Sequence, residues 1–255
     1  NYGAIPGADN YGAPAEEGYG VDVAHVSYQV DTWLWDNPDQ DAGTAVAVNG
    51  EGQSYTRATG DDANFKPNER VEASAVLTWD PENGASFVTT GLRVDADHLN
   101  IPTDAFTAEA GYGFSFLART GGHNETVEID NIDLQKGWTN LDQLESYASS
   151  FDFDDGTTDL GDGSTISSDN GAAPASVQGG ALRMTTAENG GGGAAYVLPP
   201  NFDGSSGWTM SFDFVVEHTG GNTPADGFSV NYGAIPGADN YGAPAEEGYG
   251  VDVAH

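Results

Sequence analysis

The chain has 255 residues, of which 40 are acidic and only 7 are basic, so its formal net charge is −33. A surface this negative repels nucleic acids and anionic membranes, and it attracts cations. The sequence contains no cysteine, which excludes disulfides, zinc–thiolate sites and thiol catalysis. This composition fits a protein of a saline or calcium-rich exterior, and it equally fits an ordinary soluble acidic surface.

Residues 1–25 recur letter for letter as residues 231–255. The offset from residue 1 to residue 231 gives a period of 230 residues. Identity at every position indicates either a window from a near-identical tandem array or an engineered permutant. Because so long a period can hold a complete domain, we expect the repeating unit to be a whole domain rather than a solenoid repeat.

Short runs of alternating or β-branched residues recur along the chain between clusters of Gly, Pro, Asn and Asp. They predict strands at residues 45–48, 71–78, 86–90, 113–118, 126–134, 194–198, 208–216 and 228–232. Asn83-Gly84 separates two of these runs and predicts a hairpin turn. The expected fold is all-β.

Residues 136–150 depart from this pattern, because Leu141, Leu144 and Tyr147 recur at every third position behind a candidate cap at Thr139 or Asn140. This spacing predicts a short helix or an ordered linker. The segment lies between two strand-rich blocks. We therefore expect residues 1–135 to be the C-terminal part of one domain, residues 136–150 to be an interdomain linker, and residues 151–255 to be the N-terminal part of the next copy.

Four motifs become visible when the unit is followed from residue 151 through the repeat to residue 135. They are Ala225-Asp226-Gly227-Phe228-Ser229, the Gly-rich run at 247–251 (also 17–21), Val30-Asp31-Thr32-Trp33, and the GFSFLARTGG run at 113–122. Together they resemble the legume-type (L-type) lectins and the wider concanavalin A-like lectins and glucanases. The resemblance covers most of the unit. It implies a jelly-roll sandwich of antiparallel sheets.

The resemblance also implies a carbohydrate site. In the family, the Asp of the Ala-Asp-Gly segment accepts hydrogen bonds from sugar hydroxyls, and backbone amides of two glycine-containing loops assist it. The matching positions are Asp226, then Gly248 or Gly250, and Gly122 or His123. The ring of Tyr241, Tyr249 or Trp33 is available nearby to stack on a sugar. The alternative is that Ala-Asp-Gly only shapes a loop.

A metal site beside the sugar is implied as well, with departures from the family pattern. Gln29 and Ala42 stand where the family has transition-metal ligands, so we expect that site to be lost. Calcium remains a candidate cofactor, because oxygen ligands follow one another closely at Asp31, Asp36, Asn37, Asp39 and Asp41. The alternative is a solvated acidic loop. A second acidic run, at residues 151–163, resembles a calcium-binding turn or else begins the first strand.

The related glucanases carry a Glu-x-Asp-x-x-Glu strand, and the nearest match here runs from Glu128 to Asp133. It ends in Asp, whose carboxylate is one methylene shorter. Strand alternation would turn Val127, Ile129 and, after a small bulge, Ile132 inward. We therefore expect a structural strand and a protein that is not an enzyme.

Near-identical repeats favour an extracellular or cell-surface filament, stalk or giant adhesin in which copies of the module follow one another head to tail. An alternative is strand exchange between separate subunits. Glycans are the other candidate partners. Nucleic acid is not expected as a partner of so negative a surface. Direct membrane insertion is not expected either, because no run approaches the ~20 apolar residues of a membrane helix.

Overall fold

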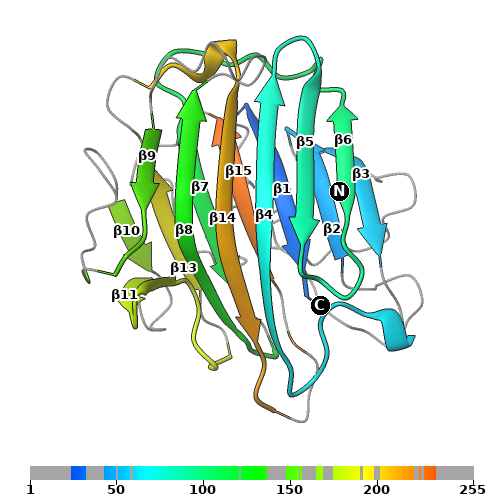
Figure 1. Cartoon of the computed structure of the whole chain (residues 1–255), viewed down its shortest axis with the longest axis vertical. Helices are drawn as coiled ribbons and strands as arrows, with labels where there is room; N and C mark the ends of the chain where they lie inside the picture. The colour runs from blue at the N-terminus through cyan, green and yellow to red at the C-terminus, as the bar shows by residue number, and fades with distance from the viewer. Residues whose placement is uncertain are drawn as a thin grey trace.

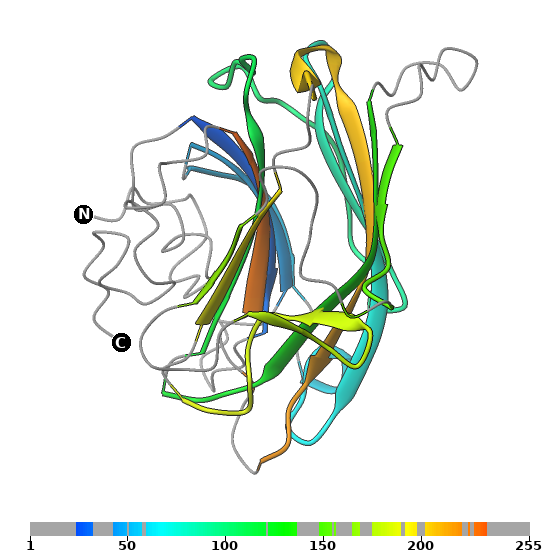
Figure 2. The same cartoon turned by 90° about the vertical axis from the view of Figure 1, so that its left-hand side faces the viewer.

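The strands of the chain form two antiparallel sheets that pack face to face (Figures 1 and 2). This arrangement is seen in a computed structural model. The model describes residues 24–32, 43–49, 51–57, 60–120, 122–136, 148–154, 156, 165–168, 175–189, 192–197, 202–220, 224 and 227–233. The expected all-β sandwich is confirmed.

One sheet has seven strands in the order β10-β13-β7-β15-β1-β2-β3. Their bounds are β10 Thr165–Ser168, β13 Gly192–Val197, β7 Gly113–Arg119, β15 Gly227–Gly233, β1 His25–Asp31, β2 Gly43–Val48 and β3 Glu51–Arg57. We call it the first sheet.

The second sheet has the order β11-β12-β8-β14-β4-β5-β6, and β9 also pairs with β8. The bounds are β11 Ser176–Gln178, β12 Ala181–Arg183, β8 Thr126–Lys136, β14 Trp208–Glu217, β4 Arg70–Asp80, β5 Gly84–Thr90, β6 Asp97–Ile101 and β9 Ala148–Phe151. Two single-turn 3₁₀ helices, η1 (Gly60–Asp62) and η2 (Gly204–Ser206), lie in connections.

Aromatic side chains fill much of the space between the sheets. Trp208 of β14 is fully buried and meets Phe114 of β7 edge to face, with ring centroids 4.8 Å apart. Tyr232 of β15 lies 5.1 Å from both rings. Each such side chain stabilises the fold by about 1.5–3 kcal/mol through burial, and T-shaped pairs add to this. The core therefore joins β7 and β15 of one sheet to β14 of the other.

All eight predicted strands are present, within a few residues of their expected bounds. Alternation in β8 also follows the prediction, since Val127, Ile129 and Ile132 are fully buried and the register shifts between them. The Asn83-Gly84 turn joins β4 to β5, as expected. Several strands escaped prediction, and most of them are short or polar: the edge strands β3, β6, β9, β10 and β11, and the three-residue β12. Edge strands lack a second neighbour, so their sequences need less apolar alternation.

The predicted helix centres on Leu141 and Leu144, which lie outside the described residues. At its described ends the 136–150 segment is strand, because Lys136 closes β8 and residues 148–150 belong to β9. β8 and β9 pair antiparallel, with Gln135 opposite Ala148. Whether this segment is an interdomain linker stays a prediction.

Strands from both sides of this segment alternate within each sheet. β14 lies between β8 and β4, and β15 lies between β7 and β1. Residues 24–136 and 148–233 therefore complete a single sandwich within this chain.

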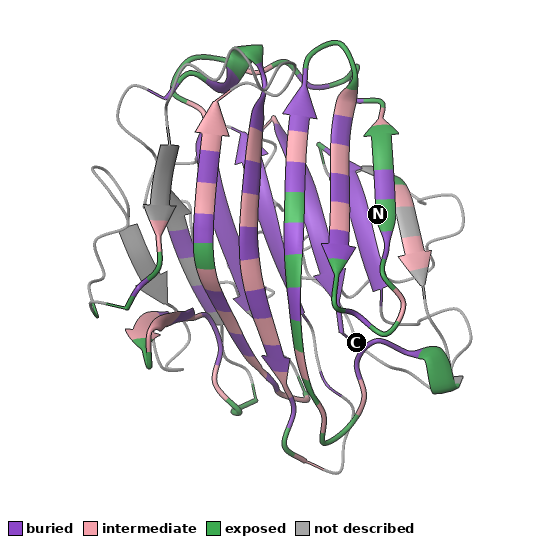
Figure 3. Ribbon diagram, in the orientation of Figure 1, coloured by how far each residue is buried: buried purple, intermediate pink, exposed green. Residues whose placement is uncertain are grey.

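The two sheets differ in how they are covered (Figure 3). Burial alternates along β4 and β14, as expected for a sheet with one open face. Every residue of β1, β2 and β15 is buried, including the polar side chains of Gln29 and Asn231 that alternate with the core residues. The first sheet is thus enclosed on both faces around its centre.

Candidate functional site

Three strand ends meet where the sequence places the predicted sugar and metal residues. Gly227, the first residue of β15, is opposite Arg119 at the end of β7. On the other side, Phe228 is opposite Val30, so Asp31 ends β1 beside the start of β15. The Asp31-Thr32, Gly122-His123 and Gly227 segments are therefore gathered at one end of the sandwich, which we call the Gly227 end.

Gly227 is fitted closely against β1. Its φ is +96°, and a Cβ at this position would stand 2.0 Å from the carbonyl oxygen of Val30. Only glycine satisfies both constraints. Thr32 lies two residues after Val30 in the chain, and its buried Oγ1 has no hydrogen-bond partner within the described part of the chain. The backbone next to Asp226 is thus held in a fixed position.

A carboxylate that sequence reasoning missed lies at the centre of this end. Glu125 is completely buried, and its Oε1 accepts a hydrogen bond of 2.8 Å from the Gly227 backbone N–H. The sequence could have indicated this burial, because Glu125, Val127 and Ile129 are spaced two residues apart and strand alternation turns all three to the same inward face. An acid at an inward position needs specific partners, since burying an unpaired charge is costly.

The loop that carries Gly122 and His123 is braced by the segment after β12. Asn189 donates from Nδ2 to the carbonyl oxygen of Gly122 at 2.6 Å, and Thr120 donates from Oγ1 to the carbonyl of Glu188 at 2.7 Å. Thr185 donates to the carbonyl of Glu125 at 2.8 Å. Gly122 is exposed and His123 is half-buried. These two residues are consequently presented on an anchored loop.

His218 is a second residue that the sequence did not indicate. It follows β14, is buried, and accepts a hydrogen bond at Nδ1 from the Asn68 backbone N–H at 3.3 Å. Burial lowers the pKa of His218, and the neighbouring His123 lowers it further. The imidazole of His218 is therefore held in its neutral form near pH 7.

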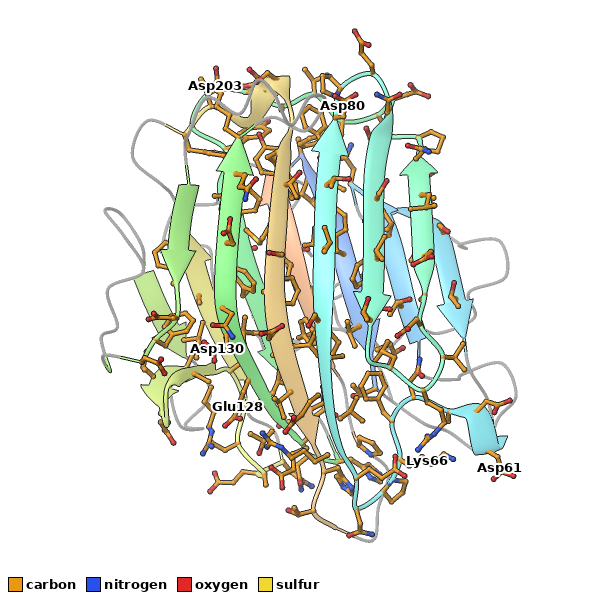
Figure 4. All side chains as sticks on the ribbon, in the orientation of Figure 1. Asp61, Lys66, Asp80, Glu128, Asp130 and Asp203 are labelled. Carbon is orange, nitrogen blue, oxygen red and sulfur yellow. The ribbon has the colours of Figure 1, made fainter. Side chains whose placement is uncertain are left out.

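Glu128, the first residue of the glucanase-like run, lies on the outer face of β8 (Figure 4). Its carboxylate accepts hydrogen bonds from Arg183 at 2.5 and 3.0 Å. Arg70 bonds to Glu72 and Glu217 nearby, at 2.8 and 2.9 Å. Glu128 is thus engaged in an ion-pair network that joins β12, β8, β4 and β14.

Asp130 lies near Asp152 and Asp154, the described acidic residues of the second acidic run. Burial raises the pKa of Asp130, and the carboxylates of Asp154, Asp213 and Asp152 add to the shift. Asp213 accepts hydrogen bonds from Asn131 at 2.8 Å and from Ser74 at 2.6 Å. Within the described ranges, no three His, Asp or Glu side chains are arranged to hold a metal ion.

Much of the predicted site falls outside the described residues. This holds for Asp226, Gly248, Gly250 and Trp33 of the carbohydrate prediction, and for four of the five calcium ligands, Asp36, Asn37, Asp39 and Asp41. Asp31 is described and is buried. The carbohydrate and calcium assignments stay predictions.

A cleft of about 580 Å³ opens at the opposite end of the sandwich, near Asp80 in Figure 4. The β4–β5 turn, the loop after β6 and Ser205 of η2 line it. Trp79 also lines it and donates from Nε1 to Thr103 Oγ1 at 3.2 Å. Glu82 and Asp104 contribute carboxylates to the rim, so the cleft offers hydrogen-bond acceptors beside an aromatic surface.

No protein-family model matches the chain, and no curated protein sequence matches it either. Among the described residues, no helix has the length and apolar character needed to cross a bilayer.

Proposed function

We propose that the chain is one unit of an extracellular or cell-surface array of jelly-roll domains that forms a filament, stalk or giant adhesin. The observation that carries the proposal is the position of the repeated segment in the sheet. Its residues 1–3 recur as Asn231–Gly233, the end of β15, and its last residue is His25, the start of β1. Gly233 lies opposite His25.

The two ends of the segment are thus neighbours in one sheet. A single copy would connect β15 to β1 as a long hairpin loop, and the chain would then continue into another unit. This continuity is the arrangement expected of a repeating chain, and it agrees with the exact 25-residue identity. When the rotation and translation that relate one unit to the next do not close into a ring, successive units form a fibre. The high negative charge keeps long arrays soluble through self-repulsion.

The array has a direct test. We expect the natural protein to run far above 26.5 kDa under denaturing conditions, in a ladder of 230-residue steps after partial proteolysis. Subunits joined only by exchanged strands would instead separate into single chains. A single-unit mass in denaturant would refute the covalent array.

A second role, carbohydrate binding by an L-type lectin module, is favoured by the convergence at the Gly227 end. There the residue after Asp226 is held by Glu125, and Gly122 and His123 lie on the adjacent braced loop. Carboxylates and backbone amides in such positions suit sugar hydroxyls. We expect Asp226→Ala to abolish glycan-array binding, with Asp95→Ala, on the connection between β5 and β6, as a matched control. Equal binding by both variants would refute the lectin role.

Calcium is proposed as a stabilising cofactor of the loop that begins at Asp31. If it binds, EGTA lowers the melting temperature, because a ligand that binds only the folded state stabilises it. A melting temperature unchanged by EGTA would contradict this assignment. We propose no hydrolase activity for Glu128 and Asp133, since Arg183 engages Glu128 on the outer sheet face.

A further inference from the structure

The β14–β15 pair occupies positions that belong to strands from the other half of the chain. We call residues 24–136 the front block and residues 148–233 the rear block. β14 pairs with β4 from Trp208 opposite Trp79 to Glu217 opposite Arg70. On its other side it pairs with β8 from Trp208 opposite Lys136 to Glu217 opposite Thr126. β15 is enclosed in the same way by β1 and β7.

The front block by itself would have a gap one strand wide in each sheet. The facing edges of β4, β8, β1 and β7 would expose unpaired backbone N–H and C=O groups. The core would also lose the fully buried or nearly fully buried side chains of Trp208, Phe212, Phe214, Phe228 and Tyr232. At about 1.5–3 kcal/mol each, these side chains make the open state strongly unfavourable. A front block must therefore obtain a β14–β15 pair from some copy of the chain.

In an array, either of two rear blocks can supply the β14–β15 pair to a front block with the same strand pairings. The connection across residues 137–147 joins β8 to β9, which are neighbours in the second sheet. In the proposed array, the connection through the repeated segment joins β15 to β1, which are neighbours in the first sheet. Since both connections link adjacent strands, the rear block that precedes a front block and the rear block that follows it are equally placed to fill the gaps.

We propose that β14–β15 is an exchangeable donor element whose partner is the front block of a second copy of this chain as well as its own. Backbone pairing in a one-strand gap is β-augmentation, and the buried aromatic side chains give it specificity. The proposal rests on the proposed array for the identity of the usual neighbour. The exchange itself is testable in this chain alone.

The absence of cysteine from the sequence makes a cross-linking test clean. Val76 on β4 and Ser211 on β14 are directly opposite each other, and Val76 is 41% exposed on the outer face of the second sheet. Val76→Cys and Ser211→Cys chains are prepared separately, mixed, unfolded, refolded together and then diluted and oxidised. We expect a disulfide-linked dimer of one chain of each kind, in an amount that rises with the protein concentration during refolding.

The expected yield follows from competition with the chain's own rear block. A tether as short as residues 137–147 gives the internal partner an effective concentration on the order of 1 mM. Refolding at about 0.1 mM should therefore place roughly a tenth of the chains in exchanged dimers. The double variant Val76→Cys/Ser211→Cys should close the same disulfide within one chain, which verifies the geometry.

The matched control uses Val76→Cys with Val88→Cys. These residues are also directly opposite, but both belong to the front block, so exchange of β14–β15 cannot place them in different chains. A second reporter, Gln29→Cys with Ser229→Cys, follows the same exchange between β1 and β15.

A dimer yield no higher than that of the Val76/Val88 control, for both reporters, would overturn the proposal. Failure of the array is a separate result. If exchanged dimers form while the natural protein has the mass of one unit in denaturant, the array is wrong and the exchange stands.

Discussion

Replacement of Glu125 by alanine tests whether the buried carboxylate holds the Gly227 end together. Glu125 has no exposed surface, and its Oε1 is 2.8 Å from the Gly227 nitrogen. The substitution removes this acceptor and leaves a buried donor without it. Gly227 cannot shift to find another acceptor easily, because its Cα packs against the Val30 carbonyl.

The expected cost follows from this geometry. A hydrogen bond contributes about 0.5–1.5 kcal/mol, and an orphaned buried donor costs about 1–3 kcal/mol. The two figures describe the same loss, and the larger one applies because the Gly227 N–H stays buried, so we expect Glu125→Ala to lower the free energy of unfolding by ~2–3 kcal/mol. For a domain of this size, that shift corresponds to a melting temperature lower by roughly 4–12 °C. Glu125→Gln keeps a carbonyl acceptor and should lose about half as much.

Urea and thermal unfolding, followed by tryptophan fluorescence and circular dichroism, measure these shifts. Glu82→Ala is the control, because Glu82 is exposed in the β4–β5 turn and should change stability by less than about 0.5 kcal/mol. If Glu125→Ala is no worse than Glu82→Ala, the Gly227 bond does not stabilise the fold. A glutamine variant as unstable as the alanine variant would show that the charge matters rather than the acceptor.

Three further predictions concern the rest of the fold. His98 is buried between the hydroxyls of Thr44 and Ser54, at 2.9 and 2.8 Å, and burial lowers its pKa below the ordinary 6.5. The unfolded chain then takes up a proton first as the pH falls below 6.5, so stability should decline there, and His98→Gln should flatten that decline in urea titrations. Asp130→Asn should stabilise by ~0.5 kcal/mol at low salt, because the raised pKa of Asp130 shows that its charge is disfavoured, and the gain should shrink at molar salt; destabilisation would contradict this. Gly84→Ala places a Cβ 2.1 Å from the Ile101 carbonyl oxygen at φ +83°, whereas Gly111→Ala has φ +91° and open space. Calorimetry should find a cost of about 1 kcal/mol for Gly111→Ala and clearly more for Gly84→Ala, and equal costs would exclude the steric contribution.

Local patterns predicted the strands well where one face meets the core. The alternation that turns Val127, Ile129 and Ile132 inward is visible in eight consecutive letters. In the first sheet the predicted strands are also present, but polar residues such as Gln29 and Asn231 are buried as deeply as the core. A period of two separates two faces of a strand, and it does not say whether the second face is covered.

The candidate site was predicted only in part. Motif order placed Asp31, Gly122, His123 and Gly227 in three segments that the fold gathers at one end. Glu125 and His218 were missed, because each acquires its role from a partner far away in the chain. Glu125 bonds to Gly227, and His218 bonds to Asn68. Strand alternation indicates that Glu125 faces inward, but neither distant partner can be identified from the local sequence.

The sequence by itself determined the all-β class, the positions of the longer strands, the β4–β5 hairpin and the presence of a repeated 25-residue segment. Each of these depends on neighbouring residues, through strand alternation, turn chemistry or direct identity of letters. Only the tertiary structure decided that β14 lies between β4 and β8, and that β15 lies between β1 and β7. Strand order is set by which distant surfaces bury the most aromatic area against one another, and that choice is made when the two blocks of the chain meet.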